Sequence, residues 1–229
     1  MFDFTPHTTD RRGFVGAVAA LGAGMALGPD TRVHRVFGAE QPAMAQDPSD
    51  AWLDRLKGMH RQLFDVPEPE GGTMLRHVRN YLDAWRDTYG VAERDVSVVV
   101  TLYARTTPVG LQDETWAKYQ LGAALSITDP TTNAPLVRNW FAHPKAGDPV
   151  ADGTPESSME ALQRRGVVFA LCNNALKRWA GRLEKSGLGA AADVHADLVA
   201  HALPGVIIVP DVLVTMTKAH ERGFGYVRS

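Results

Sequence analysis

Two kinds of apolar pattern alternate along the chain. Nearly continuous apolar runs of four to ten residues predict buried strands. They lie at residues 61–66, 95–104, 167–171 and 206–209. Longer segments, such as "TMLRHVRNYLDAWRDTYG", carry apolar residues three or four positions apart and predict helices with one buried face. Helices that alternate with apolar strands favour an α/β fold, an open and mostly parallel sheet with helices on both faces.

The C-terminal part continues this alternation. Ser157 and Glu160 predict a capping-box start to a short helix before the third strand. A helix is expected from about Asn174, another around "AADVHADLVAHAL", and another at 212–222. The dipeptide "YV" near the C-terminus predicts a short last strand.

A long loop, rich in proline and glycine, separates the two halves of this pattern at residues 126–156. A connection of this length without regular structure is uncommon in a compact domain, and it is often functional or a lid. Asn139 and His143 are its candidates for closing over a site.

The N-terminus predicts an export signal of the twin-arginine type. Arg11 and Arg12 precede an apolar run at 14–27, which is too short for a stable membrane span. Small residues at Ala43 and Ala45 suggest cleavage after position 45. Retention of the segment as an anchor is the alternative. The expected organisation is a signal peptide at 1–45, a linker and N-terminal helix at 46–60, and one α/β domain at 61–229.

Composition narrows the possible partners. The chain has 229 residues and a formal net charge of −2, with no basic stripe, so nucleic acid is not expected as a partner. No second long apolar run follows the signal, so no membrane contact is expected after cleavage. The histidines lack the spacing of a zinc site, and no phosphate-binding or dinucleotide-binding loop occurs, so neither metal nor cofactor is expected.

The one cysteine of the chain is the main candidate for chemistry. In "RGVVFALCNNALKRWA", Cys172 lies where an apolar strand runs into a helix. Ligands of open α/β sheets gather outside the carboxyl ends of the strands, and a helix N-terminus favours a thiolate. Asn173 and Asn174 offer amide donors or a helix cap. The alternative is a buried cysteine with a packing role only.

Residues after the other strands are further candidates. Arg105 and Thr106, with Thr107, follow the second strand, and Arg105 is the natural contact for an anion. Asp211 follows the "VIIVP" strand and is expected to cap the last helix.

Two segments, "GVVFALCNNAL" and "LPGVIIVPDVLVTMTKAHERGFGYV", resemble the DsrE/DsrF-like family, also called YchN-like. The resemblance implies a small α/β domain that assembles as trimers or hexamers. It also implies that Cys172 is the catalytic residue that holds sulfur as a persulfide. The family's histidine and glycine after the second strand are missing here, which leaves a shared ligand mode in doubt.

The function expected from this resemblance is that of an exported, periplasmic sulfur carrier or sulfurtransferase-like protein. Its partners would be sulfur donor and acceptor proteins. The alternative is a non-catalytic module on the same fold that binds a small ligand or a protein.

Overall fold

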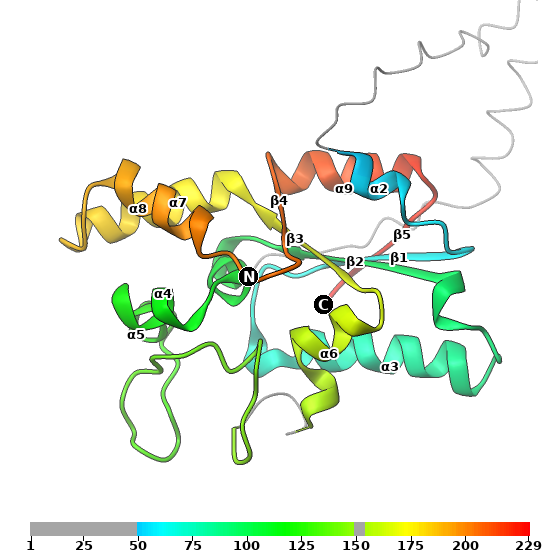
Figure 1. Ribbon diagram of the computed structural model, residues 1–229, viewed down its shortest axis with the longest axis horizontal. Coiled ribbons are helices and arrows are strands. Elements are labelled where there is room, and N and C mark those ends of the chain that lie inside the picture. The colour runs from blue at the N-terminus through cyan, green and yellow to red at the C-terminus, as the bar shows by residue number, and fades with distance from the viewer. Residues whose placement is uncertain (1–49, 149–153) are drawn as a thin grey trace, which may run out of the picture. The chain divides into compact units, whose positions relative to one another are not determined.

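The computed structural model describes residues 50–148 and 154–229. The predicted signal peptide at 1–45 lies outside the described residues. The described residues form a sheet of five strands in the order β4-β3-β2-β1-β5, and every neighbouring pair is parallel (Figure 1). The strands are β1 (His60–Asp65), β2 (Val96–Leu102), β3 (Val168–Cys172), β4 (Ile207–Val209) and β5 (Gly225–Arg228).

Helices cover both faces of this sheet, which confirms the predicted α/β class. Figure 1 shows α3 (Thr73–Asp87) and α6 (Met159–Arg164) on one face, and α2 (Ala51–Asp54) and α9 (Val212–Glu221) on the other. The remaining α-helices of the described chain are α4 (Asp113–Lys118), α5 (Leu121–Leu125), α7 (Asn173–Lys185) and α8 (Ala191–Ala200). Short 3-10 segments are η2 (Glu70–Gly72), η3 (Glu93–Asp95), η4 (Ala104–Gly110) and η5 (Pro155–Ser157). Among the described residues, none of the helices is long and apolar enough to span a bilayer.

The central strand shows why the sequence folds this way. All seven residues of β2 are buried, as a β-branched run covered on both faces requires. Val98 and Val100 lie in the larger core with Leu75 of α3, whereas Val99 lies in the second core with Trp52 of α2. Side chains alternate between the two faces of a strand, so one apolar run supplies both cores. Each fully buried valine contributes about 1.5–3 kcal/mol relative to exposure.

Part of the long loop, within the described residues 126–148, packs against the domain. Trp140 and Phe141 are buried in the larger core. Asn139 is 1% exposed, and its amide donates to the carbonyls of Val109 and Leu111 at 2.7 Å each. Thr128 pairs with Pro135 in an antiparallel bridge, and Gly122 is needed beside it, because a Cβ there would lie 2.1 Å from the Leu136 carbonyl oxygen.

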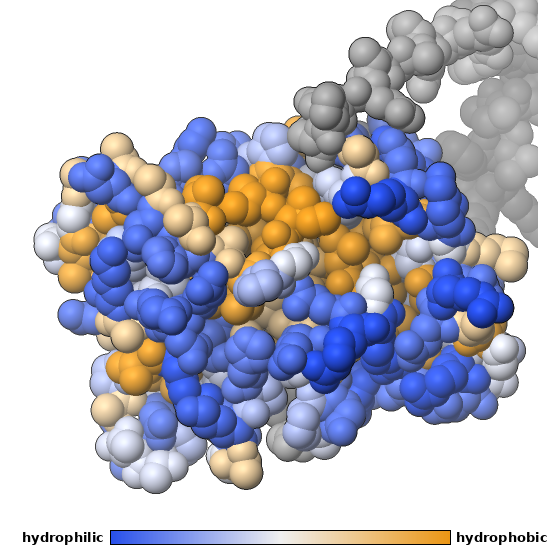
Figure 2. Space-filling view, in the orientation of Figure 1, coloured by the Kyte–Doolittle hydropathy of each residue, from blue (hydrophilic) through white to orange (hydrophobic). Residues whose placement is uncertain are grey.

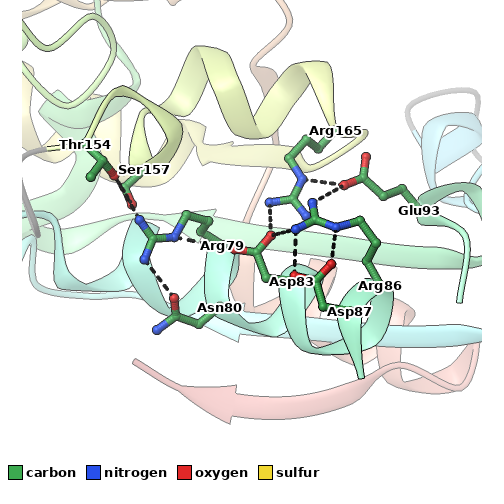
Figure 3. A network of polar contacts seen from close by, with 9 residues as sticks. All are labelled: Arg79, Asn80, Asp83, Arg86, Asp87, Glu93, Thr154, Ser157 and Arg165. Carbon is green, nitrogen blue, oxygen red and sulfur yellow. Dashed lines mark hydrogen bonds and ion pairs between the residues drawn. The ribbon is translucent and has the colours of Figure 1, made fainter. Parts of the chain in front are cut away.

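A network of charged side chains joins α3 to the segment that precedes β3 (Figure 3). Arg165 lies at the centre, with Nη1 2.9 Å from Asp83 and Nε 2.6 Å from Glu93. Arg86 lies 3.1 Å from the same Asp83 carboxylate. The network lies before the amino end of β3, the opposite end of this strand from Cys172, so its role is to hold α3, η3 and α6 together.

Of the two predicted helix caps, one differs by one residue from the structure and one agrees with it. Ser158, not Ser157, caps α6, and its hydroxyl accepts the Ala161 N–H at 3.1 Å. The last helix begins as predicted, because Asp211 caps α9 by accepting the Leu213 N–H at 2.7 Å.

Candidate functional site

A cavity of about 290 Å³ opens at the carboxyl edge of the sheet, where open parallel sheets collect ligands. Its walls come from the ends of β2 and β3, the start of α9 and one side of α7. The lining residues are Tyr103, Ala104, Cys172, Ala175, Arg178, Trp179, Arg182, Asp211, Val212 and Leu213. The volume suits a small molecule and excludes a bulky one.

Cys172 is one of the residues that line this cavity. It is the last residue of β3 and the N-cap of α7, as the sequence predicts. The residue is 1% exposed and packs with Ala175 and Val212, with Tyr103 and Met216 beside them. The residue therefore lines the cavity while it has almost no exposure to bulk solvent.

The start of α7 favours negative charge beside Cys172. The helix is 13 residues long, and the side chain of Cys172, its N-cap residue, makes no hydrogen bond to the first turn. Its first N–H groups and its dipole both stabilise an anion placed at the N-terminus. The neighbouring α9 differs, because Asp211 caps its first turn.

One wall of the cavity is basic and aromatic. Arg178 and Arg182 lie one turn apart on α7 and both line the cavity. The guanidinium of Arg182 lies 5.6 Å from the ring centroid of Trp179. The indole N–H of Trp179 donates to the Ala104 carbonyl at 2.7 Å, which fixes the ring against the end of β2.

Asp211 is the acidic residue of the lining, and its oxygens are occupied. Oδ2 accepts from the Asn174 amide at 2.8 Å, and Oδ1 accepts from the Leu213 N–H. The hydrogen bond from Asn174 is the main cause that lowers the pKa of Asp211 below its ordinary value. Asp211 is therefore a carboxylate held by neutral donors.

Tyr103 is a site residue that the sequence analysis missed. Its ring lines the cavity, and its phenol lies beside Asp65, the last residue of β1. Burial raises the pKa of Tyr103 to about 12, with the hydrogen bond to Asp65 as the second cause. Asp65 is 4% exposed and also accepts from the Tyr226 hydroxyl at 2.6 Å. The sequence could have indicated this pair, because Asp65 and Tyr103 both lie near the ends of predicted strands.

Ala104 brings an uncommon backbone conformation to the cavity wall. Its φ is +51°, in the left-handed region that favours glycine. Two hydrogen bonds hold its carbonyl, from Trp179 at 2.7 Å and from Thr107 at 3.1 Å. Conformations of this kind cost about 1–3 kcal/mol and occur often at binding sites.

The other predicted ligand contacts lie outside the cavity lining. The side-chain oxygen of Asn173 lies 2.7 Å from Nε2 of His195 in α8. Arg105 pairs with Glu68 at 2.8 Å and donates to the Leu125 carbonyl. Thr106 is fully buried, and its hydroxyl donates to the Val66 carbonyl at 2.6 Å.

The loop candidates are also placed elsewhere. Asn139 serves the packing of its own loop, as described above. His143 is exposed, and its Nδ1 lies 2.9 Å from Glu160 of α6. Across residues 50–148 and 154–229, no group of three or more histidine, cysteine, aspartate or glutamate side chains is arranged to hold a metal ion.

The mouth of the cavity adjoins apolar surface. Figure 2 shows apolar side chains gathered around β4, between the α7–α8 pair and α9. Leu213 lines the cavity and is 62% exposed, and Val214 beside it is 52% exposed. Exposed apolar side chains therefore adjoin the cavity at Leu213.

Comparison with known proteins adds little to this geometry. No protein-family model matches the chain, and no curated protein matches it. Among solved structures, the chain is similar to MTH1491, a protein of unknown function from Methanobacterium thermoautotrophicum. The identity is 17%, the TM-score is 0.39, and the match covers 74% of this chain and 99% of that one.

Proposed function

We propose that this protein carries sulfane sulfur as a persulfide on Cys172. One observation supports the proposal most directly. The single cysteine of the chain lines a cavity, at the carboxyl end of β3 and at the N-terminus of α7. A thiolate and a persulfide anion are both stabilised by such a helix start.

The chemistry needs one thiolate and a donor. The Cys172 thiol releases its proton to solvent, and the thiolate attacks the sulfane sulfur of the donor. A new S–S bond forms while the old bond to the donor breaks, and its electron pair leaves with the remainder of the donor. An acceptor thiolate later removes the outer sulfur in the same way. Because the chain has one cysteine, no internal thiol can discharge the persulfide as a disulfide.

We propose further that the protein acts in the periplasm, between a sulfur donor and a sulfur acceptor. The twin-arginine motif at Arg11 and Arg12 predicts that the carrier acts after export, in the periplasm. Donor and acceptor must then both reach a thiol that is 1% exposed. This burial also protects the sulfur from oxidation, which follows exposure and thiolate character.

A second function is a small-ligand binding module without chemistry. The packing of Cys172 with Ala175 and Val212 favours it, because buried cysteines of this kind are usually structural. The cavity would then bind its ligand with the cysteine as an apolar part of its lining.

Intact mass spectrometry separates the two functions. The protein is exposed to a sulfane-sulfur donor beside Cys172→Ser, which removes only the thiol. Carriage predicts a gain of one or more whole sulfur atoms that a reductant reverses and that the serine variant lacks. No gain in the folded wild type contradicts carriage and leaves the binding module.

A further inference from the structure

We infer that the cavity binds a small anion through Arg178 and Arg182, and that the sulfur donor of Cys172 belongs to this class. The second part rests on the proposed function, whereas the first does not. The ligand chemistry is a compact, negatively charged group joined to a short remainder. Thiosulfate is the simplest sulfane-sulfur compound of this kind.

The two arginines have no acidic partner in the described part of the chain. Arg165 and Arg222, by contrast, each form ion pairs with carboxylates at 2.6–2.9 Å. Arg178 and Arg182 lie on one side of α7 and line one cavity. Two guanidinium groups on one wall supply several N–H donors for an oxyanion, and such charge-assisted bonds are about twice as strong as neutral ones.

Trp179 contacts Arg182 and helps to position its guanidinium for this role. The guanidinium of Arg182, with its central carbon 5.6 Å from the ring centroid of Trp179, makes a cation–π contact with that ring. Arg182 is exposed and forms no ion pair with the carboxylates of the described chain, so its N–H groups are available to a ligand. Trp179 is itself 5% exposed and fixed by its bond to Ala104, so the ring that Arg182 contacts is already ordered before a ligand binds.

Asp211 does not cancel this positive charge by direct contact. Asp211 forms no ion pair with either arginine: its two oxygens accept from Asn174 and Leu213, and the bond from Asn174 is the main cause that lowers the pKa of Asp211, to which the charge of Arg178 also contributes. The lining thus has two cations, one occupied carboxylate and otherwise uncharged residues. With a volume of about 290 Å³, the cavity has room for a small anion and not for a folded partner.

The transfer step balances with thiosulfate as donor. The Cys172 thiolate attacks the outer sulfur, a Cys172–sulfur bond forms, and the S–S bond of thiosulfate breaks. Sulfite leaves with the electron pair, and the sulfur remains on Cys172 as a persulfide. The arginines hold the oxyanion end, which directs the outer sulfur toward Cys172.

The test measures thiosulfate binding by calorimetry in Cys172→Ser, where no transfer can follow. Arg178→Gln and Arg182→Gln are made in that background, with Lys177→Gln as control. Lys177 is exposed on the same helix and does not line the cavity. Each arginine variant is expected to weaken binding by about tenfold or more, as loss of a charge-assisted hydrogen bond does, and the control is expected to leave it unchanged. Far-ultraviolet circular dichroism checks that each variant folds.

A neutral donor, dimethyl trisulfide, tests the carrier function separately on the wild type. If it loads Cys172 while thiosulfate fails to bind, or binds equally well to the arginine variants, the anion inference is overturned and carriage stands. If thiosulfate binds through the arginines while neither donor loads the cysteine, the anion site is supported, and carriage and the donor class are both overturned.

Discussion

The side-chain amide of Asn174 donates a hydrogen bond of 2.8 Å to Oδ2 of Asp211. Asn174 lies in the first turn of α7, and Asp211 is the N-cap of α9. The bond therefore joins the starts of the two helices that flank Cys172. Because Asp211 lines the cavity, the bond also holds one residue of the cavity wall in place.

The first prediction removes this bond with Asn174→Ala. The variant is expected to lose about 1 kcal/mol of unfolding free energy at pH 7, a value reduced for partial exposure. The pKa of Asp211 is lowered in the folded protein, chiefly by this bond, so the stabilisation exists above its ordinary pKa of 3.8. It is lost as the pH falls through the folded pKa.

Urea denaturation at neutral and acidic pH measures this effect. The difference between wild type and Asn174→Ala should shrink when the pH drops below 3.8. Lys177→Ala on the same helix is the control and should show no such pH dependence. A difference that stays constant with pH would contradict the assignment of the bond to the ionised carboxylate.

The second prediction concerns the buried carboxylate of Asp65. Tyr226→Phe removes the hydroxyl that donates to it at 2.6 Å and leaves a 4% exposed carboxylate with fewer donors. A loss of about 1–3 kcal/mol is expected, because the desolvation of Asp65 is no longer compensated. Tyr89→Phe is the matched control, since Tyr89 is 69% exposed. Equal stability of the two variants in denaturant unfolding would refute a role for this bond.

The third prediction concerns the ionisation of Tyr103. Its pKa of about 12 lies above the ordinary value of 10.0, so the folded state keeps this phenol protonated where the unfolded chain ionises. The corresponding stability is complete below pH 10 and is lost as the pH rises through about 12. Absorbance titration of the wild type against Tyr103→Phe isolates this group. If the component that the variant lacks titrates near 10, Tyr103 is neither buried nor bonded to Asp65 as the structure describes.

The fourth prediction uses the backbone of Ala104. Glycine adopts φ = +51° without the penalty that alanine carries, so Ala104→Gly is expected to be neutral or to stabilise the fold by up to about 1 kcal/mol. Ala84→Gly, at an exposed position of α3, is expected to destabilise by about 1 kcal/mol. Thermal unfolding compares the two. Equal losses would mean that Ala104 does not hold this conformation in solution.

The fold could be predicted from local patterns because each pattern has one dominant physical cause. The run that includes Val98, Val99 and Val100 is apolar on both sides, and only a strand covered on both faces accepts it. The helix α3 was expected from Leu75, Val78 and their successors, and both of these residues are buried. The last helix was expected to begin at Asp211, and the structure confirms this cap.

The site could be predicted only in part. The sequence placed Cys172 at a strand–helix joint, which the structure confirms, but it favoured Arg105 and Thr106 as neighbours. Those residues turn away because η4 begins directly after β2 and directs them to Val66 and Glu68. The direction in which a 3-10 turn points its side chains cannot be predicted from the residue types alone.

The arginines of the cavity were missed for a related reason. Arg178 and Arg182 are ordinary charged residues on the polar side of a predicted helix, a pattern typical of a solvated face. Only the packing of α7 across the end of the sheet brings them beside Cys172. The loop at 126–156 was expected to be a candidate lid because its buried residues, such as Trp140, have no periodic pattern.

Both proposed functions require that a small molecule reaches the cavity beside Cys172 while the protein is folded. The most direct test is the rate at which iodoacetamide alkylates Cys172 at several urea concentrations below the unfolding transition. We expect a rate that is nearly independent of urea, because reaction occurs through the cavity of the native state. A rate that rises in proportion to the unfolded population would contradict it, because Cys172 would then be reachable only when the core opens.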